Sequence, residues 1–177
     1  MSRAALVLIC CSSLMGCIIT RDPSYSSPAN TPAVVTEHPD LPMTRFIEVD
    51  RSLAAAPDGG VGNPTEIVAK VRDPDIEDEL FGVVFLDRNP NSESPTVLRD
   101  FRIPARGEEE RADVREPIDF NEFPAGCHVL ELHVSRQFVG ILNPVAAEDD
   151  LGRGIWFVRV LENEEDDRAL AGCGAGQ

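Results

Sequence analysis

The chain has 177 residues, and 31 acidic against 16 basic side chains give it a formal net charge of −15 at pH 7. Such a surface repels nucleic acid, because a protein binds the phosphate backbone through Lys and Arg side chains that displace its counterions. We therefore expect no nucleic-acid partner. The length suits one domain that buries a core of its own.

The first element is a short apolar run at residues 4–15, behind an N-terminus that carries one positively charged side chain, Arg3. A membrane-spanning helix needs about 20 apolar residues. A run of this shorter length is typical of the central region of a secretory signal peptide. We therefore predict a cleaved signal peptide over residues 1–16.

The end of this run, LMGC at residues 14–17, indicates the kind of signal peptide. A branched apolar residue, a variable residue, a small residue and a cysteine in this order resemble the lipobox of bacterial lipoproteins. The resemblance implies a mature chain that begins at Cys17 with acyl chains on that cysteine, which anchor it to a membrane without spanning it. Because Ile18 rather than an aspartate follows, the resemblance also favours the outer membrane of the cell envelope.

A Pro- and Ser-rich segment comes next, with prolines at positions 23, 28, 32, 39 and 42. Proline has no N–H to donate and fixes its φ angle, so prolines at this spacing disfavour both a helix and the interior of a sheet. We predict that residues 17–43 comprise the lipidated cysteine and an extended or disordered tether.

The rest of the chain predicts strands, because short segments rich in β-branched and aromatic residues alternate with turn residues. About seven such segments with regular turns are typical of an all-β, two-sheet sandwich. We expect this domain over residues 44–163, followed by an acidic and Gly-rich tail at 164–177. The expected strands lie near residues 45–49, 65–71, 80–86, 96–103, 112–120, 128–134 and 154–161.

Hydrophobic periodicity predicts how these strands face. In the segment at 65–71, one face carries Ile67, Ala69 and Val71, and the opposite face carries Glu66 and Lys70. In the segment at 128–134, one face carries Leu130, Leu132 and Val134, and the opposite face carries Glu131 and His133. The segments at 81–86 and 155–161 are apolar on both faces and are expected to be central strands, with Trp156 in the core.

Two stretches resemble a known type of sandwich. VRDPDIEDELFGVVFLD at 71–87 runs from a strand through Asp-Pro-Asp into the next strand, and PAGCHVLELHVS at 124–135 has the pattern of a late strand. Both are similar to bacterial Ig-like, cadherin-like and PKD-type repeats, which implies a single Ig-like sandwich. Some cadherin-like repeats bind Ca²⁺ through such aspartates, so the resemblance implies Asp73, Asp75 and Glu77 as candidate ligands. The alternative is a turn in which Asp73 caps the backbone, and no other cofactor is expected.

One connection is apolar where a polar one is usual, namely FVGILNPVAA at 138–147. We expect this segment to fold over an open end of the sandwich. The alternative is an exposed patch, containing Phe138, Ile141 and Leu142, that binds a partner protein.

The five cysteines separate into two groups. Cys10 and Cys11 belong to the signal peptide and Cys17 to the lipobox, which leaves Cys127 and Cys173 in the mature chain. An exported protein occupies a compartment in which thiols oxidise. We predict a disulfide between these two cysteines that ties the C-terminal tail to the domain. The alternative is a buried Cys127 with Cys173 free or paired between molecules.

The reactive side chains form no recognisable catalytic arrangement. Cys127 and His128 are neighbours on a strand, so their side chains face apart and cannot act as nucleophile and base. No serine lies in a Gly-x-Ser-x-Gly turn. We therefore expect a non-catalytic binding or scaffolding module rather than an enzyme, with an envelope protein or polymer as its partner. The alternatives are an envelope hydrolase with an unrecognised site and a Ca²⁺-dependent adhesion module.

Overall fold

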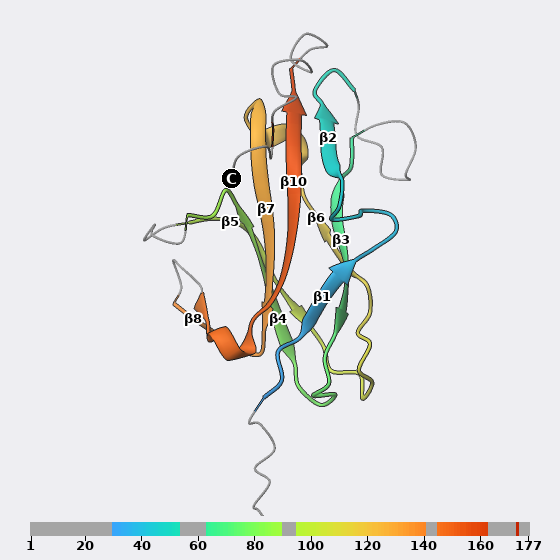
Figure 1. Cartoon of the computed structure of the whole chain (residues 1–177), viewed down its shortest axis with the longest axis vertical. Helices are drawn as coiled ribbons and strands as arrows, with labels where there is room; N and C mark the ends of the chain where they lie inside the picture. The colour runs from blue at the N-terminus through green and yellow to red at the C-terminus, as the bar shows by residue number, and fades with distance from the viewer. Residues whose placement is uncertain (1–29, 54–62, 90–94, 141–144, 163–172, 174–177) are drawn as a thin grey trace, which may run out of the picture.

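Ten strands make up the part of the chain that the structure, a computed structural model, describes: residues 30–53, 63–89, 95–140, 145–162 and 173 (Figure 1). In chain order they are β1 (Val34–Glu37), β2 (Phe46–Asp50), β3 (Glu66–Arg72), β4 (Leu80–Leu86), β5 (Thr96–Ile103), β6 (Val114–Pro117), β7 (Gly126–Ser135), β8 (Phe138–Val139), β9 (Val145–Ala146) and β10 (Gly152–Leu161). Two short 3₁₀ helices accompany them, η2 (Phe120–Glu122) and η3 (Glu148–Asp150). Within the described ranges, no helix has the length and apolar character needed to cross a membrane.

The strands form two sheets that enclose the core. One sheet has the order β1-β3-β6 and the other has the order β2-β10-β7-β4-β5, while β8 and β9 pair as a separate hairpin. Paired strands are antiparallel except β2, which runs parallel to β10. The predicted all-β, two-sheet sandwich is confirmed. A strand lies at each of the seven predicted places, and β1, β8 and β9 are additional.

Apolar side chains at alternating strand positions fill the space between the sheets. Ile67, Ala69 and Val71 of β3 belong to one buried cluster with the apolar face of β7, as the predicted periodicity requires. Trp156 is fully buried in this cluster, and its Nε1 donates to the carbonyl oxygen of Leu41 at 3.2 Å. Both β4 and β10 are central strands, as predicted, with a paired strand on each side.

The sandwich begins before residue 44, where the predicted tether was to end. The strand β1 pairs antiparallel with β3, with Val35 opposite Val71. It fits between Pro32 and Pro39, so no position in its ladder falls on a proline. Among the described strands it pairs with β3 alone, and such an edge position tolerates prolines close by.

Gly152 allows the chain before β1 to pass close to β10. A Cβ atom at this position would lie 2.3 Å from the carbonyl oxygen of Ala33, which is backbone and cannot move aside as a side chain can. The first residues of the described chain are therefore fitted against the start of the last strand.

The strand β6 covers only part of the predicted strand at 112–120, and Pro117 is its last residue. Proline cannot donate to the ladder. The next N–H, that of Ile118, donates to the carbonyl oxygen of Thr65 at 2.9 Å. Asp119 then caps η2, its Oδ1 accepting from the N–H of Asn121 at 3.0 Å.

Candidate functional site

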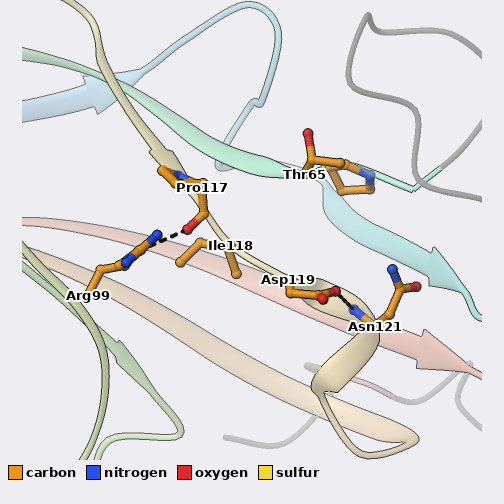
Figure 2. Close-up of a pocket in the computed structure, with 7 residues that line it drawn as sticks. Thr65, Arg99, Pro117, Ile118, Asp119 and Asn121 are labelled. Carbon is orange, nitrogen blue, oxygen red and sulfur yellow. Dashed lines mark hydrogen bonds between the residues drawn. The ribbon is translucent and has the colours of Figure 1, made fainter.

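The edge strands β5 and β6 leave a groove between the two sheets. Among the described strands, β5 pairs only with β4 and β6 only with β3. Arg99 reaches from β5 to the end of β6, where its Nε donates to the carbonyl oxygen of Pro117 at 3.3 Å (Figure 2). We call this hollow of about 360 Å³ the β5–β6 groove, and its lining residues are Pro64, Thr65, Arg99, Pro117, Ile118, Asp119 and Asn121.

The β5–β6 groove combines apolar surface with hydrogen-bonding groups. The exposed guanidinium of Arg99 is its positive charge, and Asn121 is fixed because its Oδ1 accepts from Nδ2 of the buried Asn63 at 2.9 Å. Burial raises the pKa of the neighbouring Glu116 carboxyl on β6, whereas the positive charge of Arg99 acts in the opposite direction. A second hollow of about 220 Å³ extends the groove past Arg99 to Phe123. The arrangement can hold an extended polar ligand across the sheet edges.

Asp73, the first predicted calcium ligand, contacts an arginine. Its Oδ2 accepts from Nη2 of Arg111 at 2.8 Å, and the two side chains are 1% and 0% exposed. Its Oδ1 accepts from the N–H of Asp75 at 3.0 Å, which is the backbone-capping turn considered as the alternative. Arg111 also donates to the carbonyl oxygens of Asp75 and Ile76, at 2.9 and 3.1 Å. This guanidinium therefore holds the β3–β4 turn closed.

The other two predicted ligands do not converge on Asp73. Asp75 accepts from the N–H of Thr31 at 2.7 Å through its Oδ2, and Glu77 is exposed. In the described ranges, no group of three or more His, Cys, Asp or Glu side chains is arranged to hold a metal ion. The geometry of this turn thus gives the calcium prediction no support.

The predicted apolar connection forms the β8–β9 hairpin, and its described residues divide between the two alternatives. Phe138 is half-buried, as expected of a segment that folds onto the domain, whereas Val139 is 68% exposed. Ile141 and Leu142, the other two residues predicted to bind a partner, lie outside the described residues.

The predicted disulfide is present. Cys127 at the start of β7 is bonded to Cys173, with their Cα atoms 5.5 Å apart. The C-terminal tail is thus covalently attached to the five-stranded sheet. Cys17, the predicted lipidation site, lies with the rest of residues 1–29 outside the described residues.

A buried charged cluster on β7 and β10 was not predicted. Glu131 Oε2 accepts from Nη2 of Arg153 at 2.9 Å and lies 2.9 Å from Nε2 of His133. Glu131 and His133 are only 6% and 3% exposed. Burial lowers the pKa of His133, which the hydrogen bond with Glu131 opposes.

The sequence held one indication of this cluster. Alternation along β7 predicts exposure for Glu131 and His133, since they face away from the core side of the strand. Their partners in register on β4 are Phe85 and Val83, respectively. β4 is apolar on both faces, which indicated that the outer face of the five-stranded sheet is buried at this point. The residues of β7 beside β4 are buried on the same face.

Comparisons with known proteins show similarity of architecture alone. No protein-family model and no curated protein sequence matches the chain. Among solved structures, the CARDB domain of a Pyrococcus furiosus protein in complex with di-metal ions is 11% identical with a TM-score of 0.41, over 74% of this chain and 93% of that one. A Jonesia denitrificans lytic polysaccharide monooxygenase is 9% identical with a TM-score of 0.34, over 66% and 58%. The periplasmic chaperone SfaE is 8% identical with a TM-score of 0.31, over 77% and 63%. Similarity at these scores carries no argument about function.

Proposed function

We propose that the chain is a bacterial lipoprotein that is anchored through an acylated Cys17 to the outer membrane of the cell envelope. Its sandwich then serves as a non-catalytic module that binds or scaffolds an envelope protein or polymer. The LMGC sequence at residues 14–17 supports the anchor. The β5–β6 groove is the observation that carries the binding role.

The groove suits binding because it is both accessible and prearranged. Hydrogen bonds from the backbone and from buried Asn63 fix Asn121 and Asp119 before any ligand arrives, which lowers the entropy cost of association. Arg99 provides the charged contact, and guanidinium groups recognise carboxylate and phosphate groups well. Asp119 in the same lining is acidic, so the groove suits a segment of an envelope protein or polymer that offers an acceptor to Arg99 and a donor to Asp119.

The anchor predicts the distribution of the protein between fractions. In the full chain, Cys17→Ser is expected to move the processed protein from the membrane to the soluble fraction, because the acyl chains have no thiol to join. Fractionation followed by mass spectrometry measures both location and processing. Cys10→Ser is the control, since this residue lies in the predicted signal peptide, and it should leave the protein in the membrane. A Cys17→Ser protein that is cleaved yet stays in the membrane contradicts the anchor.

The binding role predicts a charge-sensitive contact at the groove. Arg99→Glu is expected to abolish co-purification of a partner from detergent-solubilised envelopes, because it reverses the charge at the centre of the groove. Arg102→Glu lies on the same strand, with 72% of its side chain exposed, and is the matched control that should retain the partner. Equal recovery of the partner with both variants would remove the groove as the binding site.

A further inference from the structure

The strand β5 is an edge of the five-stranded sheet beside the β5–β6 groove. Among the described strands it pairs only with β4, and this pairing is regular from Arg99 to Ile103. None of its eight residues is a proline, so no backbone N–H is missing along it. The facing edge strand, β6, has only four residues and ends at Pro117. Of the two edges at the groove, β5 is therefore the one that can accept a further strand.

The register shows which backbone groups of β5 face this free edge. The N–H of Asp87, directly after β4, donates to the carbonyl oxygen of Val129 on β7 at 2.8 Å. Successive residues of a central antiparallel strand direct their backbone groups to opposite sides. The odd-numbered residues of β4 therefore bond to β7 and the even-numbered ones to β5. Gly82 is one of the latter and lies opposite Phe101, so the backbone of Phe101 is directed toward β4.

The two neighbours of Phe101 are directed the other way. By the same alternation, Asp100 and Arg102 each present a backbone N–H and a carbonyl oxygen to the free edge. Their side chains lie on the outer face of the sheet, because Asp100 is opposite Val83 and Arg102 is opposite Phe81. Neither side chain therefore stands between the free edge and the groove.

The β5–β6 groove offers an apolar wall and a positive charge below this edge. The hollow that extends it is lined by Leu98, which packs against the core, and by Ile118 and Phe123, which are buried. Arg99 crosses the groove and donates to the carbonyl oxygen of Pro117 (Figure 2). An added strand would direct every second side chain into this groove. Apolar side chains would meet the wall, and an acidic side chain would meet the guanidinium.

Resting on the proposed function, we infer that the β5–β6 groove binds an extended protein segment, which adds to the sheet as a strand antiparallel to β5. The backbone groups of Asp100 and Arg102 match a peptide backbone, whose regular spacing of amides a glycan or a phosphate polymer does not reproduce. Antiparallel pairing is the more stable kind and is already the pairing of β5 with β4. The segment has apolar residues at alternating positions and an acidic residue opposite Arg99. This narrows the partner to a protein.

Two variants of one residue separate the backbone of β5 from its side chains. Asp100→Pro removes an N–H of the free edge, a position at which a sheet tolerates proline. Asp100→Ala removes the same carboxylate but keeps the N–H, and is the matched control. The probe is the fluorescein-labelled peptide acetyl-Thr-Val-Thr-Val-Thr-Glu-Thr-amide, added to the full chain in detergent. By fluorescence anisotropy, we expect Asp100→Pro to bind this peptide about tenfold more weakly than Asp100→Ala, because a hydrogen bond is lost.

Methylated peptides test the same contact from the other side. In the antiparallel register that places the glutamate of the peptide opposite Arg99, the preceding threonine lies opposite Asp100 and donates its N–H to β5. N-methylation of this threonine should weaken binding to the wild-type protein by about tenfold. N-methylation of the valine before it, whose N–H faces away from β5, should leave the affinity nearly unchanged. If Asp100→Pro does not fold, as judged by its urea midpoint, this comparison decides alone.

Several results would show that the inference is wrong. They are equal affinities of Asp100→Pro and Asp100→Ala, equal affinities of the two methylated peptides, and no binding of the unmodified peptide at millimolar concentration. A wild-type dimer that Asp100→Pro converts to a monomer in the analytical ultracentrifuge also overturns it, because a second copy would then occupy the edge.

Co-purification from solubilised envelopes separates this inference from the proposed function. If Arg99→Glu loses the partner while Asp100→Pro retains it, the groove binds its partner without strand addition, and the inference alone is wrong. If both variants retain the partner, the groove is not the binding site, and the proposed binding role is contradicted as well. Loss of the partner with Arg99→Glu and Asp100→Pro, but not with Asp100→Ala, supports both.

Discussion

Replacing Arg111 with methionine is expected to lower the free energy of unfolding by about 3–5 kcal/mol, the usual cost of removing one partner of a buried ion pair. Methionine keeps much of the side-chain volume but leaves the carboxylate of Asp73 without its cation. The carbonyl oxygens of Asp75 and Ile76 lose their donors as well. Such a carboxylate is expensive to bury, because water no longer solvates it. Urea denaturation followed by Trp156 fluorescence measures the change.

Two further variants show whether the buried pair is the cause. Arg72→Met removes an arginine whose partner, Glu109, lies at the surface, and it should leave the urea midpoint nearly unchanged. Combining Arg111→Met with Asp73→Leu removes both charges and should recover part of the lost stability. If Arg111→Met unfolds at the same urea concentration as Arg72→Met, this ion pair does not hold the β3–β4 turn closed.

Loss of the Cys127–Cys173 disulfide is the second large effect that we expect. The bond joins residues 46 apart in the sequence. On the chain-entropy model, opening a loop of this length costs about 4 kcal/mol of stability, because the unfolded chain regains its freedom. Cys127→Ser in the exported protein should therefore unfold at a clearly lower denaturant concentration.

The pattern among the three serine variants identifies the bond as the cause. Cys127→Ser, Cys173→Ser and the double variant should lose the same stability, since each removes one and the same bond and the effects do not add. Mass spectrometry of the unreduced wild-type protein should find no free thiol. A double variant about twice as destabilised as either single variant would show that each cysteine contributes through its own packing.

The sequence was sufficient for features that depend on local pattern. Alternation in the segment 65–71 predicted that Ile67 and Val71 lie in the core, which is confirmed. The apolar residues on both faces of β4 and β10 predicted central strands, which is confirmed as well. The pairing of Cys127 with Cys173 was predicted by elimination, since the other cysteines lie in the predicted signal peptide and the predicted lipobox. In each case, the types of a few neighbouring residues, or the number of cysteines in the predicted mature chain, are sufficient for the prediction.

Features that depend on distant partners could not be predicted in this way. Arg111 ends the run GEEER, which is typical of a solvated loop, and nothing local shows that Asp73 lies 38 residues away as its partner. The β5–β6 groove likewise exists only because the edges of two sheets meet beside Arg99. The strand β1 was missed for a related reason, because its pairing with β3 outweighs the local effect of the flanking prolines.

The central position of β10 has a consequence for the order in which the molecule can fold. This last strand lies between β2 and β7, and its parallel register sets Phe46 beside Phe157. Pairing of residues so far apart requires a large loop to close, which slows folding. When the chain is synthesised from its N-terminus, the edges of β2 and β7 that pair with β10 therefore stay unpaired until residue 161 has been made and released. During that interval it is open to chaperones and to aggregation. Completion of the native state depends on the release of the C-terminal end.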